Sequence, residues 1–268
     1  MKKLHLKHGI NTAIHGGKQI KPAKIKQGVL MFGSNKLLSY KYFDFCMSFF
    51  VIILVLSNIA SSAKIVDMGF SIFGIPMAFD GGTILFPLAY VLGDLITEVY
   101  GFKAARRVIW TGFAVLAFSA LVFFVLSVLP GESLWEAEAG SAAYESILGG
   151  MSSGGIVLAS LGGYLFGSFF NSVLISKIKV MMKGKMLWLR AIASSLVGEL
   201  LDSLIFISIA CFFDVFPWEI FLSLVLTNYI LKCLVETMVL PLTYVAVRKL
   251  KKHEGIDVYD KDIKYRFF

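Results

Sequence analysis

The stretch RVIWTGFAVLAFSALVFFVLSVL, residues 107 to 129, decides the fold class, because its only charge is the arginine at its first position. An α-helix needs about 20 consecutive apolar residues to cross the hydrocarbon core of a bilayer. Five further apolar runs lie at about 43–63, 83–101, 154–176, 190–213 and 219–246. Together these runs predict an all-α integral membrane protein, a bundle of six transmembrane helices.

The composition agrees with this class. Of the 268 residues, 57% are hydrophobic and 16% are charged, and the mean hydropathy is +0.76. A soluble domain is about 45–50% apolar and about 25% charged. The composition therefore excludes an ordinary cytosolic protein and predicts a multi-pass protein of the cell (inner) membrane.

The basic residues predict the orientation of the bundle, because cytoplasmic loops carry an excess of Lys and Arg. Of the 26 basic residues, 24 fall in four segments, at 1–41, 103–107, 177–190 and 248–266. Both termini are therefore expected in the cytoplasm. Because these charges flank spans, they indicate contact with anionic lipid of the bilayer rather than direct binding of nucleic acid.

The same pattern divides the chain into three parts. Residues 1–40 are expected to form a basic, disordered cytoplasmic tail, and residues 251–268 a second basic cytoplasmic tail. Between the tails, residues 41–250 are expected to form one six-span membrane domain.

Polar residues inside the spans indicate a site, because an ionisable residue there costs about 2.5–3.5 kcal/mol and usually faces the bundle interior. Residues three or four apart share a helix face, and several of these side chains have that spacing. The polar candidates are Asn58, Asp94, Glu98, Asn171, Glu199, Asp202, Asn228, Lys232 and Glu236. They predict a cavity near the midplane.

Glu98, Lys232 and the asparagines also have a structural interpretation. Glu98 could pair with Arg106 or Arg107 across the short loop that follows its span. Lys232 could form an ion pair with Glu236 or with an acid on another helix. The asparagines are more often contacts between helices than ligand contacts.

A short internal similarity suggests a duplication. Gly93-Asp94-Leu95-Ile96 recurs as Gly198-Glu199-Leu200-Leu201, and Asn58 recurs as Asn171. This similarity favours a three-plus-three inverted repeat, a device of transporters that bind substrate at the interface between the repeats.

Enzyme chemistry is not expected. All four histidines lie in the tails, at His5, His8, His15 and His253, so no span offers an HExxH zinc site or a Ser-His pair. The chain has no GxxxxGK[ST] phosphate loop. Paired carboxylates could serve a membrane aspartyl protease, but the lysine at the same depth argues against it. Neither a metal nor a cofactor is predicted.

Four stretches together resemble the queuosine precursor transporter family, of the VUT type. They are SNIASSAK (57–64), FPLAYVLGDLITEVYGFKAARRVIWTGF (86–113), LWLRAIASSLVGELLDSLIF (187–206) and YILKCLVETMVLPLTY (229–244). The resemblance covers residues from about 40 to 250, and its most specific part is the acidic segment that ends in EVYG. Glu199 departs from the amide expected at its position in many members.

The resemblance implies uptake of a 7-deazaguanine for tRNA modification: the 7-cyano or 7-aminomethyl base, or queuine. A guanine-type edge presents two adjacent donors, which one carboxylate accepts together. Glu199 and Asp202 are the favoured acceptors, and Lys232 or an asparagine could donate to the carbonyl. Apolar walls for the ring are expected from Phe86, Tyr90, Phe206 and Tyr229.

Two alternatives of other classes remain open. One is the substrate-binding subunit of an energy-coupling-factor vitamin importer, which also has about six spans. The other is a structural or assembly protein of the membrane, in which neutral replacements of the midplane acids would change only stability. The sequence leaves the oligomeric state open, a homo-oligomer included.

Overall fold

The structure is a computed structural model that describes residues 40–72, 75–214, 216–261 and 263–267. The expectations for the basic tail at 1–40 therefore lie outside the described residues, except at Tyr40. The predicted membrane domain and the C-terminal segment fall within one compact unit, Tyr40–Phe268.

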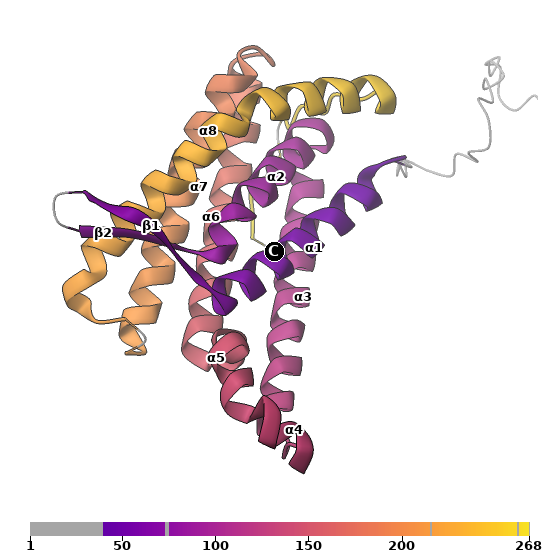
Figure 1. The fold of residues 1–268 in the computed structure, drawn as a ribbon. Coiled ribbons are helices and arrows are strands. Elements are labelled where there is room, and N and C mark those ends of the chain that lie inside the picture. The colour runs from indigo at the N-terminus through magenta and orange to yellow at the C-terminus, as the bar shows by residue number, and fades with distance from the viewer. Residues whose placement is uncertain (1–39, 73–74, 215, 262, 268) are drawn as a thin grey trace, which may run out of the picture. The chain divides into compact units, whose positions relative to one another are not determined.

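Six helices form at the six apolar runs, as Figure 1 shows. They are α1 (Phe43–Ala63), α2 (Phe86–Tyr100), α3 (Phe102–Val128), α6 (Gly154–Met181), α7 (Leu187–Phe212) and α8 (Phe221–Glu254). Among the described residues, five segments are long and apolar enough to cross a membrane. The protein is thus an all-α membrane protein in its main architecture.

The second predicted span is shorter than expected. The run at 83–101 contains α2, which has 15 residues and follows the 3-10 turn η1 (Gly81–Ile84). At 1.5 Å per residue α2 extends about 22 Å, less than the hydrocarbon core of about 30 Å. α2 ends at Gly101, whose φ of 84° is a conformation that favours glycine.

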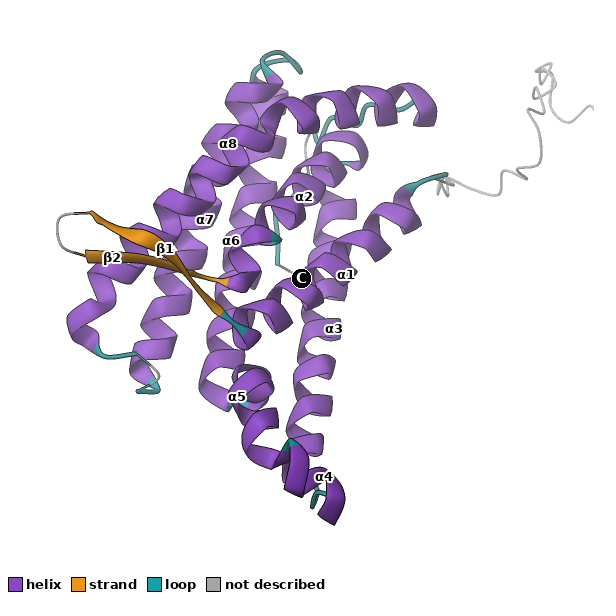
Figure 2. Ribbon diagram, in the orientation of Figure 1, coloured by secondary structure: helices purple, strands orange, loops and turns teal. Residues whose placement is uncertain are grey.

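A two-stranded hairpin interrupts the helical pattern between α1 and α2 (Figure 2). Strand β1 (Ile65–Ile72) pairs antiparallel with β2 (Ile75–Asp80), so that Ile65 lies opposite Asp80 and Ile72 opposite Ile75. Helices alone were predicted, and the hairpin corrects that expectation. The periodicity of a short apolar run does not distinguish a buried strand from a buried segment of helix.

The long loop after α3 also has structure of its own, because it forms α4 (Ser133–Glu138) and α5 (Gly140–Ser152). The Glu132 carboxylate begins α4 by accepting the backbone N–H groups of Leu134 at 2.9 Å and Trp135 at 3.1 Å. The Ser62 hydroxyl ties α5 to α1, since it donates to the Ile147 carbonyl and accepts from the Gly150 N–H.

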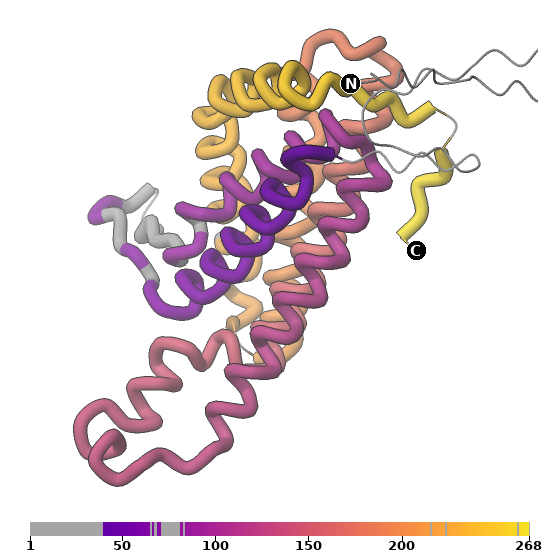
Figure 3. The backbone as a smooth tube through the Cα atoms, turned by 90° about the vertical axis from the view of Figure 1, so that its right-hand side faces the viewer, coloured from indigo at the N-terminus to yellow at the C-terminus, as the bar shows by residue number. Residues whose placement is uncertain are grey.

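α8 changes direction along its length, as the tube in Figure 3 shows. Pro241 lies inside this helix, and a proline lacks the N–H that a straight helix needs there. The 3-10 turn η2 (Trp218–Ile220) leads into α8. The C-terminal part of α8 runs to the end of the bundle where α2 ends and α3 begins (Figures 1 and 3).

Glycines bring α6 and α7 into close contact. A Cβ at Gly167 would lie 2.8 Å from the Gly198 carbonyl oxygen, and a Cβ at Gly198 would lie 2.8 Å from the Asn171 Cβ. Small residues allow membrane helices to approach this closely. The contact matters for the site, because it sets Asn171 on α6 beside the polar face of α7.

Candidate functional site

A cavity of about 30 Å³ lies between α1, α2, α3, α6 and α7. Its polar lining comes from Tyr90, Tyr164, Ser168, Asn171, Ser172 and Asp202. The rest of the wall is apolar or glycine and includes the Phe50 and Phe86 rings. One water molecule needs about 10–15 Å³ measured in this way, so the cavity has room for about two waters and not for a bicyclic base.

Two predicted site residues meet at this cavity. The Asn171 amide on α6 donates to the Asp94 Oδ1 atom on α2 at 2.7 Å, and both side chains are buried. The second oxygen of Asp94, the Asn171 carbonyl oxygen and the Tyr90 hydroxyl are buried without a hydrogen-bond partner among the described residues. Buried polar atoms normally have a partner. Tyr90 and Asn171 line the cavity, and Asp94 is bonded to Asn171 behind the wall. The unpartnered atoms of the two lining residues indicate a place for a polar ligand.

The lysine of the sixth predicted span has a carboxylate partner. The Lys232 ammonium on α8 forms a salt bridge with Asp202 on α7, and both side chains are buried. The same ammonium lies 4.9 Å from the centre of the Phe86 ring, a cation–π contact. Of the two partners that the sequence allowed, the structure selects the acid on another helix and not Glu236.

Glu199 and Glu236 occupy a separate position between α7 and α8. Glu199 is fully buried at 0% exposure, and Glu236 is 6% exposed. The Ser195 hydroxyl donates to one oxygen of Glu236. Glu199 lies next to Glu236 and Cys233, but neither of its oxygens accepts a hydrogen bond of normal geometry in the described part of the chain. Glu199 does not line the cavity that Asp202 lines.

Three further predicted site residues also lie away from the cavity wall. Asn58 donates to the Leu54 carbonyl of its own helix at 2.8 Å. This bond does not mirror the bond between Asn171 and Asp94, so the contact pattern adds no support to the inverted repeat. Asn228 is half-buried on α8. Tyr229 is also half-buried, and it lies beside Cys233 and Glu199.

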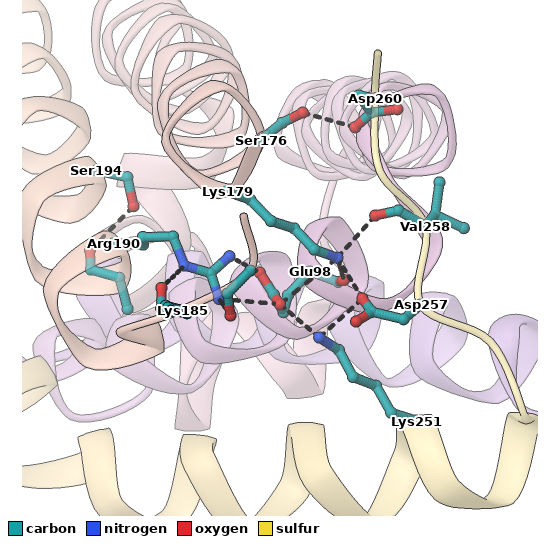
Figure 4. Close-up of polar contacts among 12 residues, drawn as sticks. Glu98, Ser176, Lys179, Lys185, Arg190, Ser194, Lys251, Asp257, Val258 and Asp260 are labelled. Carbon is teal, nitrogen blue, oxygen red and sulfur yellow. Dashed lines mark hydrogen bonds and ion pairs between the residues drawn. The ribbon is translucent and has the colours of Figure 1, made fainter. Parts of the chain in front are cut away.

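Glu98 lies outside the cavity, in a buried ion cluster where α2 ends (Figure 4). The Arg190 guanidinium on α7 donates to its two oxygens at 2.5 and 3.2 Å. The Lys251 ammonium on α8 donates to it at 2.6 Å, and the Lys179 ammonium on α6 lies 3.5 Å away. One carboxylate thus connects three other helices.

The predicted pairing of Glu98 with Arg106 or Arg107 is wrong. Arg106 instead donates to the Arg266 carbonyl at 3.1 Å, and the Arg107 guanidinium lies over the Phe43 ring at 5.9 Å. Lys179, Arg190 and Lys251 were expected only as basic residues that set the orientation of the bundle. The position of Lys179 three residues beyond the predicted end of its span was a signal that a lysine could be buried there.

The C-terminal segment supplies the remaining charge of this cluster. Asp257 accepts from Lys179 at 2.5 Å and forms an ion pair with Lys251 at 2.9 Å. Burial raises the pKa of Asp257, but the two lysines lower it by more, so the pKa stays below its ordinary value. Asp260 accepts from the Phe102 N–H at 2.7 Å and from the Ser176 hydroxyl at 2.6 Å.

Comparison with known proteins identifies the family. Residues 80–246 match the model of the family described as "Putative vitamin uptake transporter". A "Probable queuosine precursor transporter" of Bacillus subtilis is 28% identical over 65% of this chain and 73% of its own length. The "Queuosine precursor transporter" of Escherichia coli is 27% identical over 72% of this chain and 83% of its own length.

A third relative, the "Probable queuosine precursor transporter" of Haemophilus influenzae, is 25% identical over 63% of this chain and 71% of its own length. No solved structure gives a significant match. The family is one of transporters and not of enzymes. The chain belongs to the queuosine precursor transporter family.

Proposed function

We propose that this protein takes up a queuosine precursor of the 7-deazaguanine class across the cell (inner) membrane. The names of the relatives support the class of substrate. The observation that supports the site is a pair of buried polar atoms without partners among the described residues, Tyr90 Oη and Asn171 Oδ1, on residues that line the same cavity as Asp202.

The chemistry of these atoms suits a guanine-type edge. Such an edge has two adjacent donors, the ring N–H and the exocyclic amine, and one carbonyl acceptor. The Asp202 carboxylate and the Asn171 carbonyl can accept from the donors, and the Tyr90 hydroxyl can donate to the carbonyl. Lys232 holds Asp202 in place. We therefore assign the reading of the edge to Asp202 rather than to Glu199, which lies away from the cavity.

The remaining site residues receive supporting roles in this proposal. Asp94 orients Asn171 through their hydrogen bond, and Phe86 forms part of the apolar wall. Because the present cavity holds about two waters, a base can bind only after helices separate. The Glu98 cluster then acts as the gate on the cytoplasmic side, because it binds α2, α6, α7 and α8 together.

The membrane arrangement is part of the proposal. We infer that the chain crosses the membrane six times, with both termini in the cytoplasm. The short helix α2 is counted as a crossing in addition to the five longer ones. The end of the bundle that carries Lys179, Arg190 and Lys251 would face the cytoplasm, and α4 with its acids would face the outside. Cysteines introduced at Glu138 and at Lys183 test this orientation. An impermeant reagent added outside should label only the first, and equal labelling would contradict the topology.

Binding of 7-aminomethyl-7-deazaguanine to the detergent-solubilised protein tests the site. Losing one hydrogen-bonded carboxylate costs about 1–3 kcal/mol, so the Asp202→Asn variant should bind about 5- to 150-fold more weakly. Glu138→Gln makes the analogous change from acid to amide on the exposed end of α4 and should bind like the parental protein. Unchanged affinity of the Asp202→Asn variant would mean that the edge is read elsewhere, and it would favour a structural role for the acid.

A further inference from the structure

The middle of the bundle has more acids than cations. Four carboxyl groups there are more than nine-tenths buried, with exposures of 2% for Asp94, 0% for Glu199, 7% for Asp202 and 6% for Glu236. Of the 26 basic residues, 24 lie in the segments 1–41, 103–107, 177–190 and 248–266, which flank the spans. Lys64 directly follows α1, so among the described residues Lys232 is the basic residue at this depth.

The four carboxyl groups cannot all be ionised at the same time. Fully ionised, the four acids and one lysine would place three uncompensated negative charges in a medium of low dielectric constant. The cost of burying an unpaired carboxylate is large enough that such a group takes up a proton instead. Lys232 neutralises Asp202, so the other acids must be neutralised by bound protons.

The hydrogen bonds show which acid is best suited to hold a proton. One oxygen of Asp94 accepts from Asn171, and one oxygen of Glu236 accepts from Ser195. Both oxygens of Glu199 lack such a donor among the described residues. The Cys233 thiol and the Lys232 ammonium lie close enough to favour the ionised form of Glu199, but Lys232 already pairs with Asp202. Burial and the neighbouring Glu236 act against the ionised form and outweigh them.

Several other titratable groups lie around the two glutamates. The groups that face them are Tyr90 and Asp94 on α2, Asp202 on α7, and Tyr229, Lys232 and Cys233 on α8. Among these only Lys232 is a cation, and Asp202 already pairs with it.

A water molecule fits beside one member of the pair, Glu236. A second cavity of about 10 Å³, room for about one water molecule, is lined by Glu236 together with Ser195, Cys233 and Thr237. A proton carrier needs such a contact, because its proton must come from water on one side and return to water on the other.

We infer that Glu199 and Glu236 form a proton-binding site of the transporter, and that uptake of the base is coupled to entry of protons. The inference rests on the proposed function, because it assigns a coupling ion to the same carrier. In each cycle a carboxylate of the pair binds a proton from outside and releases it to the cytoplasm. Asp202 and the cavity residues hold the base, and the glutamate pair carries the proton.

The test uses the full-length chain in liposomes and measures two activities. Exchange of labelled for unlabelled 7-aminomethyl-7-deazaguanine needs no gradient, whereas accumulation of label against its gradient needs a driving ion. We expect an inward proton gradient to drive accumulation by the parental protein. The Glu199→Gln and Glu236→Gln variants should still exchange the base but should lose at least tenfold of the accumulation.

The outcomes of this experiment distinguish failure of the inference from failure of the proposed function. Glu138→Gln, an exposed change from acid to amide, should keep both activities. Three results would overturn the inference but leave the proposed function standing. The first is accumulation driven by a sodium gradient instead of a proton gradient. The others are exchange without any driven accumulation, and driven accumulation that persists in the two variants. If the correctly inserted parental protein neither exchanges nor accumulates the base, the proposed function itself fails.

Discussion

Lys232 and Asp202 carry opposite charges, and both side chains are buried in the bundle. Their pairing couples α8 to α7, and the contact of Lys232 with the Phe86 ring adds α2. Removing one partner of a buried pair leaves the other uncompensated, which costs about 3–5 kcal/mol, whereas removing both can cost little.

Lys232→Met should therefore destabilise the protein strongly, by about 3–5 kcal/mol, and abolish uptake. The double variant Lys232→Met/Asp202→Asn should recover most of the stability but none of the uptake. Unfolding of the detergent-solubilised variants, followed next to uptake, checks both statements. A single variant as stable as the parental protein would show that the pair does not hold the helices together.

At this scale the sequence predicted which residues are polar but not how they pair. The cost of burying charge made Asp202 and Lys232 recognisable as partners of some kind, and the structure confirms that Lys232 has a carboxylate partner. Glu98 contacts Arg190 and Lys251, which follow it by 92 and 153 residues. No local spacing rule reaches that far, so proximity along the chain wrongly favoured Arg106 and Arg107.

The contact between α6 and α7 decides where the polar faces of both helices lie. Gly167 lies against α7 so closely that a Cβ would be 2.8 Å from the Asp202 Cβ and 3.0 Å from the Tyr90 hydroxyl oxygen. An added methyl group can be accommodated only if the helices move apart, and that displacement would carry the cavity wall with it.

Gly167→Ala should accordingly lower stability by about 1–3 kcal/mol and weaken binding of the base. Gly149→Ala on α5 is the matched control, because its Cβ would meet nothing closer than 4.0 Å and alanine is the better helix former. Melting temperatures in detergent distinguish the two variants. Equal melting temperatures would show that α6 and α7 have room to separate at no cost.

The positions of the long helices were predicted more accurately than the number and the lengths of the elements. Helices α1, α3, α6, α7 and α8 form at five of the apolar runs, because an apolar run of that length strongly favours a helix in a membrane. The sequence did not predict the short length of α2, which has 15 residues, or the hairpin and the two helices after α3. Turn residues and backbone pairing decide these features, and hydropathy does not report either of them.

In the whole protein, the C-terminal segment connects the helix ends on one side of the bundle. The backbone N–H of Val258 donates to the Val99 carbonyl, and Phe267 stacks on Phe169 at 3.7 Å. Gly101 is suited to the position beneath this segment, since a Cβ there would lie 2.8 Å from Val258. The sequence described this region only as a basic tail, yet its acids Asp257 and Asp260 make the contacts.

Lys179 and Lys251 lower the pKa of Asp257 in the folded protein. The contribution of Asp257 to stability is therefore fully present above its pKa in the unfolded chain, about 3.9, and is lost as the pH falls through its lower pKa in the folded protein. Asp257→Asn imitates the protonated state at neutral pH. The variant should release the segment and speed tryptic cleavage at Lys261. Glu138→Gln should leave the rate of tryptic cleavage unchanged. If the Asp257→Asn variant resists trypsin as well as the parental protein does, other contacts hold the segment.

The central claim is that this chain carries a 7-deazaguanine base through a midplane site that contains Asp202. Uptake of the labelled base by cells that lack both its synthesis and any other transporter for it tests this claim most directly. The parental chain should restore uptake, Glu138→Gln should match it, and Asp202→Asn should take up the base at least tenfold more slowly at limiting concentration. A parental chain that is present in the membrane but gives no uptake above empty cells, or an Asp202→Asn variant that matches the parental rate, would contradict the account.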